Sequence, residues 1–310
     1  ATQEEAEEET VRMLNVYREF MENVLAIPVI AGQKSEKEKF AGADHTYTVE
    51  AMMLDGKALQ MGTSHNLGQN FAKGFDIQFL DRDGQLKYAW QTSWGVSTRM
   101  IGGLIMVHGD ERGLKLPPRV APVQCVIVPV AAHKEGVLEK AQELYDILKD
   151  AGIRVELDDR DQSPGWKFNE WELKGVPVRL EIGPRDIEKG ACMLARRDTC
   201  EKESYPLENI GETVRELLDR IHGDMFANAL AHREERTFDA HSWEEFMQGI
   251  EEGHGFVRAM WCGETECEEA IKEKTGVTTR CAPFEQKDLG EVCVHCGKPA
   301  KKMMYFAKSY

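Results

Sequence analysis

The chain has 310 residues, of which 42% are hydrophobic and 30% charged, and its formal net charge is −15. This length favours two or three domains, and the composition excludes an intrinsically disordered protein. The acidic excess argues against indiscriminate binding to nucleic acids or membranes, although it leaves room for a local basic patch. No apolar run is long enough for a transmembrane helix. The first ten residues lack the pattern of a signal peptide, so a reducing, cytoplasmic location is expected.

The first third of the chain predicts a mixed α and β region. Periodic or alternating apolar residues predict a helix at 2–26, strands at 45–54 and 75–80, and a buried helix at 99–108. Pro28 ends the first helix. The pair Gly102 and Gly103 would let the last helix pack closely against a sheet. The polar segments 60–68 and 94–99 are expected to be loops.

A different pattern begins at Pro122 and predicts an α/β domain of about 100 residues. Its expected elements are a strand at 123–130, a helix at 134–151, strands at 153–157, 176–182 and 191–196, and a closing helix at 214–230. Gly152 has the position of a helix C-cap. From about Met225 the chain is expected to be mostly helical until a cysteine-rich segment begins.

Four of the eight cysteines have the spacing of a metal site. Cys262 and Cys267 form a C-x4-C pair, and Cys293 and Cys296 form a C-x2-C pair after a linker of 25 residues. Two such pairs can complete a tetrahedron of thiolates with no open position for a substrate. Soft thiolates favour Zn²⁺, so a structural zinc site is predicted. Three alternatives are that His295 replaces one ligand, that the thiols are free and buried, or that they form disulfides.

Polar side chains that suit a nucleotide and a small polar ligand gather in two segments before residue 120. They are Gln60, Thr63, Ser64 and His65 in the first segment, and Trp94, Ser97, Thr98 and Arg99 in the second. At the start of a helix, the Arg99 guanidinium can bind a phosphate or stack on a base. Neither GxGxxG nor GxxxxGK[ST] occurs, so no Rossmann or P-loop site is supported. Taken alone, these residues are equally consistent with ordinary hydrogen-bonded loops.

Several long motifs occur before residue 120. The most specific are ALQMGTSHNLGQNF at 58–71 and YAWQTSWGVSTR at 88–99, supported by segments 39–44, 107–110 and 113–119. These motifs closely resemble those of the prolyl-tRNA synthetases of the eukaryote-like or archaeal type. That type has an anticodon-binding domain like that of histidyl-tRNA synthetase and a zinc-binding C-terminal domain that ends in tyrosine. The α/β pattern, the four spaced cysteines and the final Tyr310 agree with this resemblance.

The resemblance implies an α/β and α+β multidomain protein with three parts. These are part of a class II antiparallel-sheet catalytic domain at 1–121, an α/β anticodon-binding domain at 122–224, and a zinc-binding domain at 225–310. It also implies a ligase that uses ATP with Mg²⁺ to convert proline to prolyl-adenylate and then transfers proline to tRNA(Pro). Such chemistry needs positioned donors and cations rather than a protein nucleophile.

Matching positions give each candidate residue an expected role. Gln60 and Thr63 match residues that contact ATP, and Arg99 matches the motif 3 arginine, which is also the catalytic candidate. His65 matches a residue of the proline pocket, with Trp94 and Ser97 on the neighbouring wall.

For the tRNA anticodon we select Arg160 and Lys167. Both lie near Trp166, and cations interleaved with aromatic rings suit unstacked bases. Packing in a core is the alternative for the aromatic side chains.

The family's motif 1, which builds the dimer interface, and motif 2, whose arginine binds the ATP α-phosphate, are expected to lie before Ala1. The chain alone is therefore expected not to form prolyl-adenylate, and a homodimer is expected for the full-length enzyme. One alternative is a non-catalytic tRNA-binding fragment or module with a structural zinc site. Another is an unrelated zinc-stabilised interaction protein.

Overall fold

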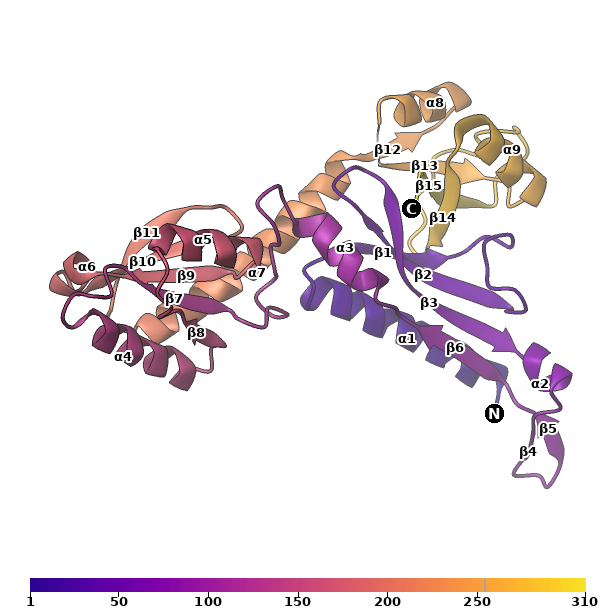
Figure 1. Cartoon of the computed structure of the whole chain (residues 1–310). Helices are drawn as coiled ribbons and strands as arrows, with labels where there is room; N and C mark the ends of the chain where they lie inside the picture. Colours follow the sequence, from indigo (N-terminus) through magenta and orange to yellow (C-terminus); the bar gives the residue numbers. More distant parts are fainter. Residues whose placement is uncertain (254) are drawn as a thin grey trace. The chain divides into compact units, whose positions relative to one another are not determined.

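A computed structural model describes residues 1–253 and 255–310 (Figure 1). The chain forms two compact units. Unit 1 comprises residues 1–23, 27–103 and 230–310, and unit 2 comprises residues 24–26 and 104–229. The predicted three-domain boundaries stay a prediction. Among the described residues, none of the helices combines the length and the hydropathy of a membrane-spanning segment.

An eight-stranded sheet organises unit 1, in the order β12-β13-β15-β14-β1-β2-β3-β6. The strands are β1 (Val29–Gln33), β2 (His45–Met52), β3 (Ala58–Gly68), β6 (Gln91–Gly95), β12 (Thr237–Ala240), β13 (Phe256–Trp261), β14 (Thr278–Pro283) and β15 (Lys302–Ala307). All neighbours are antiparallel except β12 and β13. Because β14 pairs with β1, strands from the first and last parts of the chain share one sheet.

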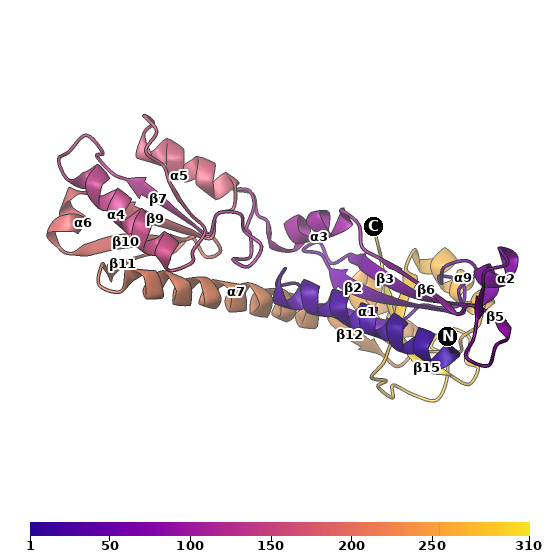
Figure 2. The ribbon, with the colours of Figure 1, turned by 90° about the horizontal axis from the view of Figure 1, so that it is seen from below.

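Helix α1 (Gln3–Asn23) packs on one face of this sheet, against β2, β3 and β6 (Figure 2). Its buried residues recur at helical spacing and include Leu14, Tyr17 and Met21, so the predicted amphipathic helix is confirmed, although it ends three residues early. The other helices of this unit are α2 (Asn70–Gly74), α8 (Trp243–Glu251) and α9 (Thr265–Thr275). A small hairpin joins β4 (Gln78–Leu80) to β5 (Leu86–Tyr88).

Helix α3 (Arg99–His108) has the predicted bounds. Its two glycines, Gly102 and Gly103, differ in the space around them. A Cβ added at Gly103 would lie 2.7 Å from the side chain of Met61 on β3, whereas Gly102 faces open space. The predicted close approach to a sheet is therefore confirmed for Gly103 alone. The helix is only partly buried, because Ile101 and Ile105 are exposed.

Unit 2 is an α/β layer structure, as the sequence predicts. Its sheet has the order β11-β10-β9-β7-β8, with β7 (Cys125–Pro129), β8 (Val155–Leu157), β9 (Val178–Ile182), β10 (Ala191–Arg196) and β11 (Lys202–Pro206). The helices are α4 (Val137–Asp150), α5 (Pro164–Leu173), α6 (Pro184–Glu188) and α7 (Ile210–Glu235). Strand β7 is parallel to both β8 and β9.

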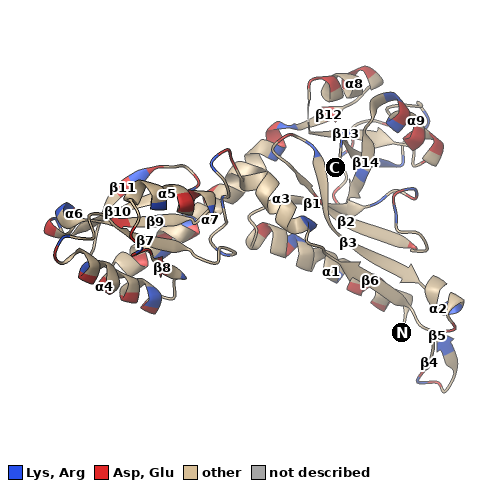
Figure 3. Cartoon of the chain, in the orientation of Figure 1, with Lys and Arg blue, Asp and Glu red and all other residues tan. Residues whose placement is uncertain are grey.

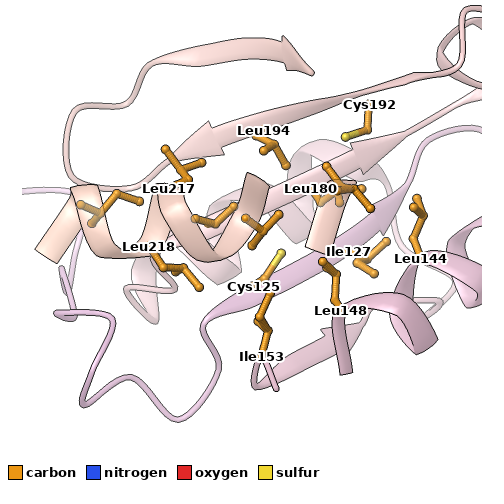
Figure 4. Close-up of a cluster of buried hydrophobic side chains, with 14 of the residues drawn as sticks. Cys125, Ile127, Leu144, Leu148, Ile153, Leu180, Cys192, Leu194, Leu217 and Leu218 are labelled. Atoms are coloured by element: carbon orange, nitrogen blue, oxygen red, sulfur yellow. The ribbon is translucent and has the colours of Figure 1, made fainter. Parts of the chain in front are cut away.

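The main core of unit 2 lies between this sheet and helices α4 and α7 (Figure 4). Ile127 and Leu180 on the sheet meet Leu144 on α4 and Leu217 on α7. Helix α5 belongs to a separate cluster around Val126 and Val128, which alternate with the residues of the main core along β7. Gly152, with φ of +79°, follows α4 in the left-handed conformation predicted for its end.

Two predictions of local structure were wrong. The segment 60–68 lies in strand β3 instead of a loop, and Trp94 lies in strand β6. Polar side chains occur on both faces of β3. Ser64, for example, lies on the α1 face, where its hydroxyl donates a hydrogen bond to the Thr10 carbonyl oxygen of that helix. The alternation that marks a strand is therefore missing. The region after Met225 contains strands β12 and β13 as well as helices, since short apolar runs fit both.

Candidate functional site

A β-bulge in β3 gathers three of the predicted ligand-binding residues on one face. Residues 60 and 63 would face opposite sides of a regular strand, because side chains alternate. The register shifts between Val49 and Glu50 on β2, so that Glu50 pairs with Gln60 and Met61 is the extra residue. Gln60, Thr63 and His65 consequently share the face opposite to α1. Thr46 and Thr48 of β2 lie beside His65 and Thr63 on this face.

The imidazole of His65 is held by two neighbours. The Thr46 hydroxyl lies 3.0 Å from Nδ1, and the same hydroxyl accepts a hydrogen bond of 2.9 Å from the Phe40 amide. The Phe40 ring centroid is 4.9 Å from that of His65. Burial lowers the pKa of His65 below its ordinary value, so the ring is neutral near pH 7. Thr46 and Phe40 were not predicted as candidate site residues, although segment 39–44, which contains Phe40, is one of the matching motifs.

Arg99 lies next to Gln60, another residue that is predicted to contact the nucleotide. Its Nη1 donates a hydrogen bond of 3.3 Å to the Gln60 carbonyl oxygen, and its backbone amide donates to the Ser97 hydroxyl. The side chain is exposed, and no carboxylate of the described residues pairs with it. An unpaired guanidinium beside polar groups is suited to binding a phosphate.

The structure does not bring Trp94 beside His65. Trp94 lies directly opposite Ser64 in the β3–β6 register, whereas Ser93 lies opposite His65. Because the Ser64 hydroxyl donates to the Thr10 carbonyl oxygen of α1, Trp94 occupies the α1 face of the sheet, where it is 49% exposed. Its predicted contact with the proline pocket stays a prediction.

A buried charge cluster adjoins the polar face and was not predicted. Glu50 is fully buried, and it accepts hydrogen bonds from Lys34 Nζ at 2.8 Å and from Arg280 Nη2 at 2.7 Å. The Thr48 hydroxyl donates to it as well. Burial raises the pKa of Glu50, but the two cations and their hydrogen bonds outweigh burial, so the pKa lies below its ordinary value. Glu50 is therefore ionised at neutral pH.

The four predicted metal ligands lie together. The Sγ atoms of Cys262, Cys267, Cys293 and Cys296 are all within 4.8 Å of one another. Both cross-pairs, Cys267 with Cys293 and Cys262 with Cys296, are 3.6 Å apart. A tetrahedral site with Zn–S distances of about 2.3 Å requires S···S distances of about 3.8 Å, so the cluster has the size of such a site. All cysteines of the described residues are free, and the sulfurs of the two cross-pairs are too far apart for a disulfide, in which they would be about 2.0 Å apart.

His295 lies beside the cysteine cluster. Its Nδ1 is 3.4 Å from Cys267 Sγ, and its Nε2 is 2.9 Å from Lys274 Nζ. Burial raises the pKa of Cys262 to about 11. Because metal ligation requires thiolates, binding of a cation would release protons here.

The two residues selected for the anticodon differ in exposure. The Arg160 guanidinium lies 5.2 Å from the centroid of the exposed Trp166 ring, and its Nη2 is 2.7 Å from both Asp158 Oδ2 and Glu170 Oε2. Lys167 is only 2% exposed, and its ammonium donates to the Asp158 carbonyl oxygen. Direct contact of Lys167 with RNA would require the ammonium to leave this partner. Acidic and basic residues are interspersed along α4, α5 and α6 (Figure 3).

Comparison with known proteins agrees with the motifs and the fold. A family described as an anticodon binding domain matches residues 124–217, and the prolyl-tRNA synthetase C-terminal family matches residues 243–310. The chain is 61% identical to a proline–tRNA ligase of Acetoanaerobium sticklandii and 62% identical to one of Alkaliphilus oremlandii, each over 310 residues. These matches cover 100% of this chain but only 64% of the length of either relative.

A solved structure is also similar over the whole chain. The crystal structure of prolyl-tRNA synthetase from Cryptosporidium parvum, in complex with L-proline and AMP, superimposes with a TM-score of 0.95 at 41% identity. The match covers 100% of this chain and 68% of that one. The chain therefore belongs to the prolyl-tRNA synthetase family.

Proposed function

We propose that this chain supplies part of the ATP and proline site of a proline–tRNA ligase. One observation carries the proposal: the β3 bulge places Gln60, Thr63 and His65 on one face, with the unpaired Arg99 guanidinium beside Gln60. Membership of the family supports it, and so does the relative described as a complex with L-proline and AMP.

In this proposal the residues bind and orient two substrates. Arg99 neutralises charge on the ATP phosphates, which carry Mg²⁺, while Gln60 and Thr63 donate hydrogen bonds to the nucleotide. His65 and the Phe40 ring contact proline, and Ser97 is proposed on the neighbouring wall. Trp94 is left out of this site, because its register places it on the α1 face of the sheet. A carboxylate oxygen of proline attacks the α-phosphorus, and the bond to pyrophosphate breaks. The protein contributes position and charge to this step.

We further propose that the cysteine cluster holds Zn²⁺. Four thiolates would fill the tetrahedron and leave no position for a substrate, so the metal would be structural. The cluster joins the start of α9 to the segment between β14 and β15, and its ligation would stabilise that region.

The partner proposed for unit 2 is tRNA(Pro). Trp166 offers an exposed ring for stacking, Arg160 lies against it as a cation, and Lys167 supports the loop through Asp158. A homodimer and a cytoplasmic location stay expectations for the whole enzyme.

Amino-acid-dependent ATP–pyrophosphate exchange tests the ligase proposal. The protein to assay joins this chain to the preceding part of its relatives, with proline, cysteine and alanine as substrates and the 310-residue chain alone for comparison. Exchange with proline alone is expected, and it should be lost in Arg99→Gln but kept in Arg82→Gln, which removes an exposed arginine from the β4–β5 turn. If the longer protein catalyses no exchange with any of the three amino acids but still binds tRNA, a non-catalytic tRNA-binding module is favoured. Activity of the chain alone would contradict the expectation that it cannot form prolyl-adenylate.

A further inference from the structure

We propose that Thr46 is a positioning residue that fixes the tautomer of His65. In this arrangement the Thr46 hydroxyl donates its proton to Nδ1, and the ring proton resides on Nε2. The neutral His65 then presents an N–H donor to the bound amino acid. The inference rests on the proposed function insofar as His65 faces the proline site.

The hydroxyl of Thr46 has two hydrogen-bond partners, and their chemistry decides the direction of each bond. The side chain is buried, with 2% exposure, and its oxygen has two partners within hydrogen-bond distance, the Phe40 amide and His65 Nδ1. An amide nitrogen can only donate, so the hydroxyl accepts from Phe40. A hydroxyl has one proton to give, and His65 Nδ1 is its only acceptor among the residues that the structure describes.

The opposite tautomer of His65 would leave the Thr46 hydroxyl proton without an acceptor. If Nδ1 carried the ring hydrogen, the Thr46 oxygen would accept from both neighbours, and its own proton would be buried without an acceptor. Such an unmade hydrogen bond is unfavourable. Thr46 and His65 also lie directly opposite each other in the β2–β3 register, and the Phe40 ring packs beside the imidazole. Rigid strands and a packed ring therefore hold the two groups in this geometry.

The tautomer decides which ligand atom His65 can recognise. No group of the described residues bonds to Nε2, which leaves it available to a ligand. A protonated Nε2 can only donate, so it requires an oxygen acceptor. Proline offers two carboxylate oxygens, of which one becomes the bridging oxygen of the mixed anhydride in the adenylate and the other remains as its carbonyl oxygen. The ring nitrogen of proline is a cationic donor and is excluded as the partner. We therefore infer that His65 selects the carboxyl end of the substrate.

The test is a nitrogen NMR experiment on the whole 310-residue chain, loaded with zinc and labelled with ¹⁵N at histidine. Spectra are recorded at about pH 8, well above the ordinary imidazole pKa of about 6.5. The His65→Gln variant identifies the His65 signals. A single tautomer is expected, with a bare Nδ1 and a protonated Nε2. A proton on Nδ1 in the unsubstituted chain would overturn the inference, whatever the variants do.

Two substitutions at position 46 complete the test. Thr46→Val keeps the shape and removes the hydroxyl, so the Nδ1 signal should move and the tautomers should mix. Thr46→Ser restores the hydroxyl and should restore the original spectrum. An unchanged spectrum in Thr46→Val would show that the hydroxyl does not set the tautomer.

Kinetics of the longer protein separate this inference from the proposed function. Thr46→Val should raise KM for proline roughly tenfold, the value of one hydrogen bond, and Thr46→Ser should stay near the original value. If His65→Gln leaves KM for proline unchanged, the proposed role of His65 fails, even where the spectra show the expected tautomer.

Discussion

Arg280 on β14 and Glu50 on β2 form a buried ion pair, with 2.7 Å between Arg280 Nη2 and Glu50 Oε2, although 230 residues separate them in the chain. Lys34 provides a second cation to the same carboxylate. A buried ion pair does not by itself prove a gain in stability, but removal of one partner leaves a buried charge without compensation.

Replacement of Glu50 should therefore be strongly destabilising. Glu50→Gln leaves two buried cations facing a neutral amide, and the free energy of unfolding should fall by about 3–5 kcal/mol. Urea unfolding of the two proteins measures the difference. Glu269→Gln is the control, because it removes the carboxylate of an exposed pair with Lys37, and it should change the urea midpoint little. Equal effects of the two substitutions would contradict the importance of the buried cluster.

Asp158 should contribute stability that depends on pH. Burial raises the pKa of this carboxyl, but hydrogen bonds from Arg160 and Trp171 outweigh burial and lower the pKa to about 2. Since the folded pKa lies below the unfolded value of about 3.9, the contribution is complete above about pH 5 and is lost as the pH falls towards 2. The difference in urea midpoint between the original protein and Asp158→Asn should shrink over this window. A constant difference would contradict the assignment.

Zinc content provides a direct test of the cysteine cluster. The purified chain should hold one zinc ion, and Cys267→Ser should lower its metal affinity by at least about tenfold, together with its melting temperature. Elemental analysis after dialysis measures the content. Cys200→Ser is the matched control, because Cys200 is exposed and outside the cluster. Equal loss of zinc from both variants would rule out the proposed ligand set.

The two glycines of α3 should respond differently to alanine. Gly102→Ala places a methyl group in open space and should stabilise the helix by about 0.5–1 kcal/mol. Gly103→Ala brings a methyl group to within 2.7 Å of the Met61 side chain, which must move, and this cost should cancel the gain in helix propensity. Thermal unfolding of both variants checks the order. A larger gain for Gly103→Ala would contradict the close packing.

Binding of tRNA(Pro) by the chain should depend on the surface formed by Trp166 and Arg160. Trp166→Ala should weaken binding by about tenfold or more, as expected for the loss of one stacking platform. Arg160→Gln should weaken binding and reduce the salt slope by about 1 if the guanidinium meets a phosphate. Titrations at several salt concentrations measure both. An unchanged affinity and salt slope in both variants would show that another surface binds the RNA.

Much of the fold could be predicted because its signals are local. The β-branched run before residue 130, the amphipathic α4 and the left-handed Gly152 report directly on the α/β unit. The clustering of the four cysteines could likewise be predicted, because the spacing within each pair is local in the sequence. In contrast, Glu50 and Arg280 gain their meaning only when two distant strands become neighbours in a sheet, and no local pattern encodes that register.

The candidate site shows the same division. The matching motifs predicted Gln60, Thr63 and His65 as candidate site residues, but they could not show that a bulge at Met61 brings these side chains to one face. The role of Trp94 was inferred without its register, and that register places it on the other side. Burial of Lys167 was not predicted, because the sequence pattern predicted no helix where α5 lies, and only that helix places Lys167 one turn before the buried Trp171.

The pairing of β14 with β1 also bears on how this protein could be shortened. Removal of residues 230–310 would leave the hydrogen-bonding groups of β1 without a neighbour along one side and would take Arg280 away from Glu50. A free strand edge of this kind is a template for pairing with other chains. The C-terminal segment therefore covers this edge of the sheet, and a chain truncated before it should aggregate instead of folding as an independent fragment.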